Sequence, residues 1–96
     1  PINPNDDVNR GQSSNDVFPA VMHVAGVDAI EGRMLPALDR LRATLHAKAD
    51  VHAGVVMLGR THLQDATPVT LGQVIGGWAG QLDDARVPLA FACSGL

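Results

Sequence analysis

The chain has 96 residues, of which 46% are hydrophobic and only 3% aromatic, and its formal net charge is -3 at pH 7. A chain of this length forms at most one domain, and its aliphatic composition is typical of a piece of a larger helical assembly. The net charge and the lack of a basic patch argue against a nucleic-acid partner. No apolar stretch reaches the roughly 20 residues that span a membrane.

Residues 1–12 are rich in proline, asparagine and aspartate, which oppose both helix and strand, so we expect a loop. Because the first residue is Pro1 and not Met, we expect the chain to begin inside a longer gene product. A signal peptide is not expected, since no basic segment followed by an apolar run is present at this end.

A first helix is expected over residues 13–31. Serine, asparagine and aspartate side chains at its start can accept hydrogen bonds from the free amides of a first turn. With Asp16 as the capping residue, Pro19 would occupy the third helical position, where the missing amide hydrogen is tolerated. Gly32 interrupts the apolar pattern and is expected to end this helix.

A second helix is expected over residues 33–53, where apolar residues recur with the 3.6-residue period of an α-helix. Charged residues are assigned to the opposite face, Gly54 is expected to end the helix, and no element is assigned to residues 55–58. The apolar stripe comprises Met34, Leu38, Leu41, Leu45 and Ala49, and the charged face comprises Asp39, Arg40, Arg42 and Lys48.

A third helix is expected over residues 70–87. Gly72, Gly76 and Gly80 are spaced by four residues and predict close packing against a neighbouring helix, since each glycine otherwise weakens the helix. Pro88 is expected to end the helix, and the residues after it have no readable period. The buried face is expected to comprise Leu71, Val74, Ile75, Trp78, Leu82 and Ala85.

The sequence therefore predicts an all-α fold of about three helices, part of a long-helix bundle, with no complete domain within residues 1–96. The single cysteine, Cys93, cannot form an internal disulfide. A reducing compartment and a cytoplasmic location are expected for that reason.

Two polar clusters stand at element boundaries, where functional residues often collect. Ser13, Ser14 and Asn15 could simply cap a helix, but one capping residue suffices, and a helix N-terminus can also bind a carboxylate. Thr61 and His62 pair a hydroxyl with an imidazole that titrates near neutral pH, which suits binding and deprotonating a small carboxylic acid. His62 could equally be a loop histidine bonded to a backbone carbonyl.

No metal site is expected. His23, His46 and His52 lie on different helical faces or segments and lack the spacing of a zinc site. The acidic residues near the N-terminus are not followed by the alternating acids of a calcium loop.

Three segments, residues 4–9, 12–19 and 59–73, resemble signature segments of the class II fumarases in the aspartase/fumarase superfamily. The likeness runs over residues 1 to about 84. It covers the start of the central helical domain of a protein several times longer.

The resemblance implies reversible hydration of fumarate to (S)-malate in the tricarboxylic acid cycle, without metal or organic cofactor. By position, Ser13, Ser14, Asn15 and Thr61 would hold the substrate carboxylates, and His62 would donate or accept a proton, acting on the water that is added or lost. The family's carbon-acid base is a serine on a mobile loop far downstream, and its site combines three subunits of a homotetramer. The 96-residue chain alone is therefore expected to be inactive.

Asn3 stands where the family usually has His, in a peripheral anion site that Asn5 and Asp6 would also line, and we expect it to weaken that site. Two alternatives remain open. One is an aspartate ammonia-lyase of the same superfamily, in which Gln typically stands at the position of His62 and Ser-Thr at residues 13–14. The other is a helical assembly module that keeps these motifs without turnover.

Overall fold

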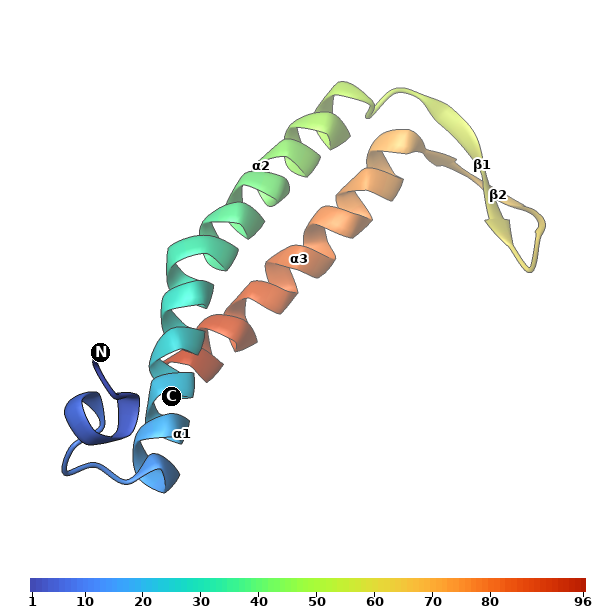
Figure 1. Cartoon of the computed structure of the whole chain (residues 1–96). Coiled ribbons are helices and arrows are strands. Elements are labelled where there is room, and N and C mark those ends of the chain that lie inside the picture. The colour runs from blue at the N-terminus through green and yellow to red at the C-terminus, as the bar shows by residue number, and fades with distance from the viewer.

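The computed structural model describes all residues from Pro1 to Leu96 and shows a long antiparallel pair of helical rods with a β-hairpin beyond one end (Figure 1). The molecule measures 68 × 28 × 28 Å. Its elements in chain order are the π-helical turn η1 (Pro4–Val8), α1 (Ser14–Ala29), the π-helical turn η2 (Ile30–Met34), α2 (Leu35–Val51), β1 (Val56–Thr61), β2 (Gln64–Thr70) and α3 (Leu71–Cys93). The predicted helical fold is thus right in outline, with a small two-stranded sheet in addition.

The first rod runs through α1, η2 and α2 without the break expected at Gly32 (Figure 1). The backbone stays helical across the junction, where the amide of Leu35 bonds to the carbonyl of Ile30, five residues back. A wider turn of this kind accommodates Pro36, which has no amide hydrogen and would crowd the carbonyl four residues before it. One glycine costs a helix only about 1 kcal/mol, so the helix continues through Gly32.

Two prolines lie inside helices instead of marking their ends. α1 begins at Ser14, so Pro19 falls in its second turn and not at the third position. α3 continues through Pro88 to Cys93, although the sequence predicted an end at residue 87. Buried Cys93 and half-buried Leu89 and Ala90 hold these last turns, so packing outweighs the lost hydrogen bond.

Strands β1 and β2 form an antiparallel hairpin where the sequence predicted no regular structure. Val56 pairs with Thr70 at the base and Thr61 with Gln64 at the tip, and an irregularity after Leu58 shifts the register by one residue. Gly59 is needed there, because a Cβ at this position would lie 2.9 Å from the carbonyl oxygen of Thr67.

The small core lies where α2 packs against α3. Only 4 of 96 residues are buried, which shows how little of the chain is covered by its own fold. Ile75 is buried as predicted, and Ala79, which the sequence assignment missed, is fully buried. Trp78 and Ala85, both assigned to the core, are exposed, and so is Leu41 of α2.

Charged residues of α2 face α3, contrary to the solvent-exposed face predicted for Asp39 and Arg42. Arg86 donates to Asp39 at 2.7 Å, and Arg42 donates to Asp39 at 2.8 Å and to Asp83 at 2.6 Å. His46 lies 2.9 Å from Asp83. The hydrogen bond from Arg86 lowers the pKa of Asp39, and the one from Arg42 lowers the pKa of Asp83.

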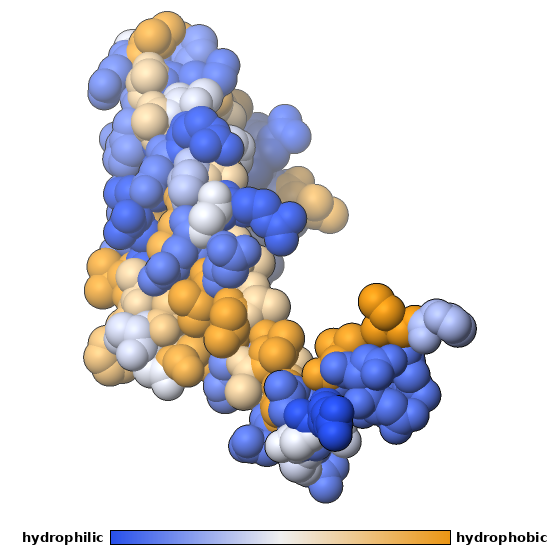
Figure 2. All heavy atoms as spheres, turned by 60° about the vertical axis from the view of Figure 1, so that its left-hand side comes forward, coloured by the Kyte–Doolittle hydropathy of each residue, from blue (hydrophilic) through white to orange (hydrophobic).

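The surface is large and partly apolar. The chain exposes 7456 Å², whereas a compact monomer of its mass would expose roughly 5,200 Å². Figure 2 shows apolar atoms gathered on the lower part of the rod. None of the helices combines the length and apolar character needed to cross a lipid bilayer. Exposed large apolar residues of α1 and of the last turns of α3 include Phe18, Val21, Met22, Val24 and Phe91.

Candidate functional site

The first polar cluster, Ser13 to Asn15, forms the N-terminus of α1. Ser13 has extended backbone angles of the kind an N-cap residue adopts, yet its side chain makes no capping hydrogen bond. Its carbonyl accepts from the amides of Asp16 and Val17 at 3.1 and 2.9 Å. The side-chain cap that offered the simpler interpretation of these residues is therefore not formed.

The three side chains are exposed and have no hydrogen-bond partner within the chain. A helix N-terminus adds free amides and a partial positive charge at the same place. Hydroxyl, carboxamide and backbone donors are thus present together at one exposed helix start, a combination that suits a carboxylate.

A hollow beside this cluster separates η1 from α1. Polar groups of Asn5 and Asn9 contribute one wall, and Val17 and Phe18 contribute an apolar one. Ser14 also lines it. The hollow therefore brings one residue of the predicted substrate cluster near one residue of the predicted peripheral site.

The second polar cluster, Thr61 and His62, occupies the tip of the β-hairpin. His62 and Leu63 form a two-residue turn in which both have positive φ, 51° and 62°. Such turns match the twist of a hairpin but are usually made by Asn and Gly. A left-handed residue with a side chain costs roughly 1–2 kcal/mol, and strain of this kind is often found at functional sites.

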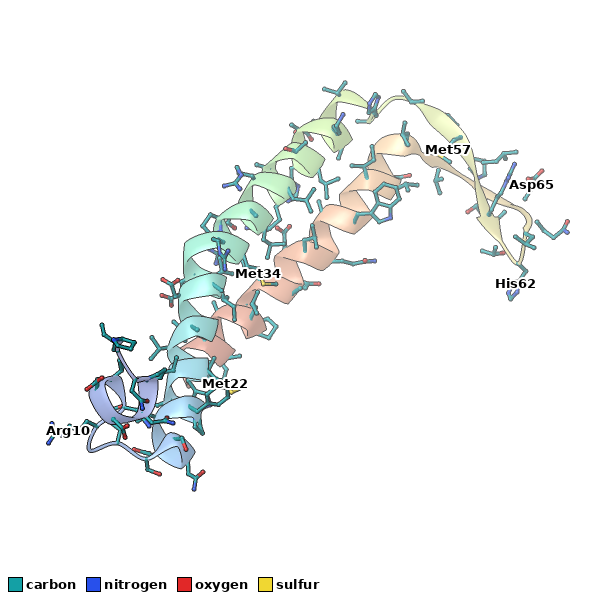
Figure 3. The ribbon with its side chains drawn as sticks, in the orientation of Figure 1. Arg10, Met22, Met34, Met57, His62 and Asp65 are labelled. Carbon is teal, nitrogen blue, oxygen red and sulfur yellow. The ribbon has the colours of Figure 1, made fainter.

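His62 projects from the end of the hairpin, away from the helices (Figure 3). Neither its imidazole nor the hydroxyl of Thr61 has a hydrogen-bond partner in the chain, and both residues are exposed. The alternative of a loop histidine satisfied by a backbone carbonyl is thus not what the structure shows.

The two clusters lie at opposite ends of the molecule. α1 begins at the end marked by Arg10, and His62 is at the far end of the hairpin (Figure 3). The long axis measures 68 Å, many times the length of a small dicarboxylate. The structure brings Thr61 and His62 together, and Ser13 to Asn15 together, but does not bring the two groups to one site within a single chain.

Residues of the predicted peripheral anion site come together around η1, but they bond to one another. The Asn3 carboxamide donates to Asp6 at 2.6 Å and accepts from the amide of Asn5 at 2.9 Å. The backbone amide of Asn3 donates to the Asp7 carboxylate at 2.8 Å. Both ends of the Asn3 side chain are therefore occupied, and the two carboxylates beside it would repel an anion.

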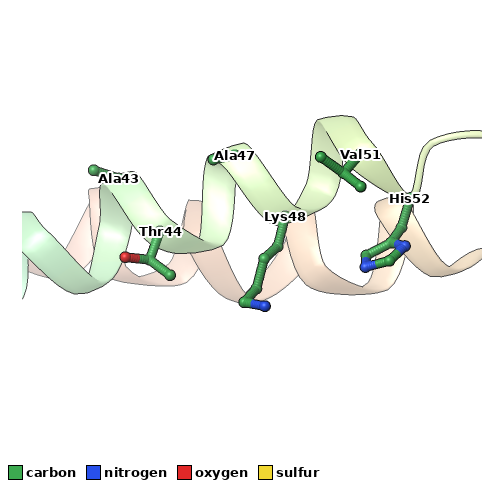
Figure 4. A pocket seen from close by; sticks show the side chains of 6 residues that line it. All are labelled: Ala43, Thr44, Ala47, Lys48, Val51 and His52. Carbon is green, nitrogen blue, oxygen red and sulfur yellow. The ribbon is translucent and has the colours of Figure 1, made fainter.

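Other hollows contain none of the predicted site residues. The one in Figure 4 lies on the exposed face of α2 and is lined by small and apolar side chains together with Lys48 and His52. Another lies between β1 and α3. No three His, Cys, Asp or Glu side chains are grouped so that they could hold a metal ion.

The hairpin that carries His62 was not predicted from the sequence. Across this hairpin Arg60 lies opposite Asp65, with 3.8 Å between the guanidinium and the carboxylate. Opposite charges on facing positions support a strand pair. In the sequence, Arg60 and Asp65 stand symmetrically on either side of the His62–Leu63 turn and its closing pair. This spacing of opposite charges was the signal that could have revealed the hairpin.

Comparison with known proteins shows which proteins share the sequence segments that contain these clusters. A sequence model of the family described as "Lyase" matches residues 1–92. Fumarate hydratase class II of Chromobacterium violaceum is 63% identical over 81 residues, which is 84% of this chain and 18% of that protein. The Bacillus subtilis fumarate hydratase class II is 60% identical over 85 residues, 88% of this chain and 18% of that protein.

Solved structures agree with these sequence matches. The recombinant class II fumarase from Schistosoma mansoni aligns with a TM-score of 0.76 at 41% identity, covering 88% of this chain and 18% of that one. A fumarate lyase:delta crystallin from Brucella melitensis aligns with a TM-score of 0.82 over 97% of this chain and 21% of that one, also at 41% identity. These matches confirm the resemblance seen in the three sequence segments. The chain spans about a fifth of the length of these relatives.

Proposed function

The chain belongs to the lyase family whose model matches residues 1–92, and we propose that it is a segment of a class II fumarate hydratase. The reaction would be the reversible addition of water to fumarate to give (S)-malate, as a step of the tricarboxylic acid cycle. The observation that carries the proposal is that the side chains of Thr61 and His62 have no hydrogen-bond partner, with His62 on a strained turn and Thr61 directly before it. It lies within a stretch where relatives named fumarate hydratase class II are up to 63% identical.

Each cluster has a chemical task in this proposal. Removing a proton from carbon beside a carboxylate builds negative charge, which neighbouring hydrogen-bond donors must stabilise. Ser13, Ser14 and Asn15 would bind one or both carboxylates at the start of α1, and Thr61 would add a hydroxyl. His62 would transfer a proton to or from the water that is lost or added, because an imidazole changes charge near neutral pH.

The separation of the clusters supports a site built from several copies of the chain. A substrate cannot touch the start of α1 and the hairpin tip of one rod 68 Å long. In a closed homo-oligomer the same contact repeats around the symmetry axes, so a tip from one copy can meet the helix start of another. We propose a homotetramer, without metal or organic cofactor, in the cytoplasm.

Of the alternatives, an aspartate ammonia-lyase is not favoured. The relatives reported above are named fumarate hydratases and not ammonia-lyases, and His62 stands where aspartases typically have Gln. A non-catalytic assembly module would show no turnover of either substrate.

Absorbance of fumarate in the presence of the purified full-length protein separates these functions. Loss of fumarate that needs no ammonium, with malate as the product, is expected for a hydratase. Loss only when ammonium is added would establish the ammonia-lyase. If fumarate absorbance stays constant both with and without ammonium, in a correctly assembled oligomer, the result would favour the assembly module and contradict the proposal.

A further inference from the structure

The first turn of α3 lies directly against the last turn of α2, and Gly72 is the point of contact. A Cβ built on Gly72 would lie 2.5 Å from the carbonyl oxygen of Ala49, and 2.7 and 2.9 Å from Cα and N of Ala53. All three are backbone atoms, which cannot turn aside as the end of a side chain can. A larger residue at this position would therefore have to push the two helices apart.

The same contact is the base of the β-hairpin. The amide of Gly72 donates to the carbonyl of His52 at 3.0 Å, and the amide of Leu71 donates to that of Val55 at 2.8 Å. The first pair of the hairpin, Val56 with Thr70, follows immediately. The direction in which the hairpin leaves the rod is thus set at Gly72.

Strand β2 passes into α3 without a loop, so the strand and the helix move together. Thr70 ends the strand and caps the helix: its hydroxyl accepts from the amide of Gln73 at 3.0 Å, while its own amide donates to the Gln73 side chain at 2.9 Å. This reciprocal capping stiffens the joint. A tilt of the first turn of α3 will be transmitted to the hairpin tip.

We propose that Gly72 is a positioning residue, which fixes the place of His62 in the active site by allowing this close contact. The inference rests on the proposed hydratase function. Gly72 does not touch substrate; it acts through the hairpin that carries the imidazole.

The size of the effect follows from the geometry. Ordinary contact begins at 3.4 Å, so a methyl group at Gly72 must move the backbone away by about 0.9 Å. Ala79, fully buried one and a half to two turns further along α3, is the natural pivot; it is about 10 Å away at 1.5 Å per residue. The hairpin reaches roughly 20 Å beyond the contact at about 3.3 Å per residue. The tip would then move by about 2–3 Å, and a misplacement of about 1 Å can cost 100-fold in rate.

Other glycines of α3 provide matched controls. Close packing was predicted along Gly72, Gly76 and Gly80, but within the chain it holds only at Gly72. A Cβ at Gly76 would meet only the Ala49 side chain, at 3.9 Å, and one at Gly77 or Gly80 would meet nothing within 4 Å. Gly77 is also exposed, which makes Gly77→Ala the better control.

The test compares Gly72→Ala with Gly77→Ala in the full-length enzyme by steady-state kinetics, with assembly checked by size. Gly72→Ala is expected to lower kcat at least 10-fold. KM should rise no more than about 10-fold, because Thr61 moves with the hairpin tip whereas the proposed carboxylate-binding residues on α1 are untouched. Gly77→Ala should stay within about twofold of the wild type. A normally assembled Gly72→Ala enzyme with near-normal kcat would overturn the inference.

A double-mutant cycle separates positioning from simple loss of stability. If Gly72 acts through His62, then His62→Asn should cost at least 10-fold less in the Gly72→Ala enzyme than in the wild type. Equal costs in both backgrounds would overturn the inference. Failure of the wild-type protein to hydrate fumarate would instead contradict the proposed function, so the two outcomes are distinct.

Thr70→Gly covers the case in which Gly72→Ala does not assemble. This variant loosens the joint between β2 and α3 without adding volume at the contact. A fall in kcat of about 10-fold, with KM raised no more than in Thr61→Ala, would support the inference. An unchanged kcat would overturn it.

Discussion

Two polar clusters near the N-terminus use their hydrogen-bonding groups in opposite ways. Around η1, Asn3 bonds through its carboxamide to Asp6 and to the amide of Asn5, so the cluster is closed upon itself. At the start of α1, Ser13 and its neighbours leave their side chains free, even where a cap would be expected. The difference shows that a polar sequence alone does not identify a binding site; what counts is which donors the fold leaves unpaired.

The hairpin tip resembles the start of α1 in this respect. Thr61 and His62 also lack partners within the chain, and their turn is held in a conformation that is unfavourable for both His62 and Leu63. We therefore propose that the two open clusters carry the chemistry and that the closed cluster has a structural role. Four measurements sharpen or break this comparison.

Replacing His62 by Asn is expected to have the largest effect. Turnover by the full-length enzyme should fall roughly 10²–10⁴-fold, the usual range for a lost general acid–base group. KM should change much less, because the residues proposed to bind the carboxylates remain. His23→Asn is the control, since His23 lies on the surface of α1, away from both open clusters. Near-normal turnover by an assembled His62→Asn enzyme would contradict the assignment.

Removing one side chain that is proposed to bind a carboxylate should have a smaller effect of a different kind. Asn15→Ala and Thr61→Ala are each expected to raise KM by about 10-fold with a smaller change in kcat, since a hydrogen bond to a charged group contributes roughly 1.5–3 kcal/mol. Gln12→Ala, an exposed change in the preceding loop, should have no effect. An unchanged KM in both variants would show that these residues do not hold the substrate.

Acid should weaken the contact between α2 and α3. The pKa values of Asp39 and Asp83 are lowered in the folded protein by their arginine partners, so their contribution to stability is complete above the ordinary value of 3.8. It is lost as the pH falls below that value towards the folded-state pKa. Urea unfolding between about pH 3 and pH 6 checks this, with Arg42→Met as the comparison. The variant should lose less stability on acidification, and an equal loss would argue against the pairs.

Asn3→His in the closed cluster is expected to have the smallest effect. Histidine could restore a positive charge for an anion, but Asn3 touches neither open cluster and its bonds lie within η1. Turnover of the full-length enzyme should change less than about threefold, since changes outside a reacting site leave transition-state binding intact. A tenfold rise or fall would place this position in the chemical step.

The sequence predicted the helices better than their junctions. The 3.6-residue apolar period is strong in α2 and α3, and both were assigned correctly in type. Gly32 and Pro88 were expected to end helices and instead lie within them, and Pro19 lies in the second turn of α1 and not in the first. At these positions a wider helical turn or packing against the rest of the chain outweighs the local preference of one residue. Neither effect can be predicted from the identity of that residue alone.

The hairpin and the ion pairs were beyond the reach of periodicity. Residues 55–58 form a continuous apolar run, and Pro68 speaks against a strand, so the alternating pattern is hidden. Asp39 and Arg42 were placed towards solvent because charged side chains usually lie there. Their partners on α3 are more than 40 residues away in the chain, so the pairing could not be predicted from local sequence. The motifs were enough to name the candidate site residues. They could not predict that the two groups of residues lie at opposite ends of the molecule.

The central claim is that the start of α1 and the hairpin tip act on one substrate from different copies of the chain. Mixing His62→Asn subunits with Asn15→Ala subunits, after unfolding and refolding them together, tests it most directly. The assay uses fumarate well below KM, where each variant alone should have at most about a tenth of wild-type activity. If each site takes the two clusters from different subunits, random mixing should return about a quarter of wild-type activity, since that share of sites contains neither change. Activity no higher than the sum of the two separate variants, in mixed oligomers of the correct size, would contradict the account.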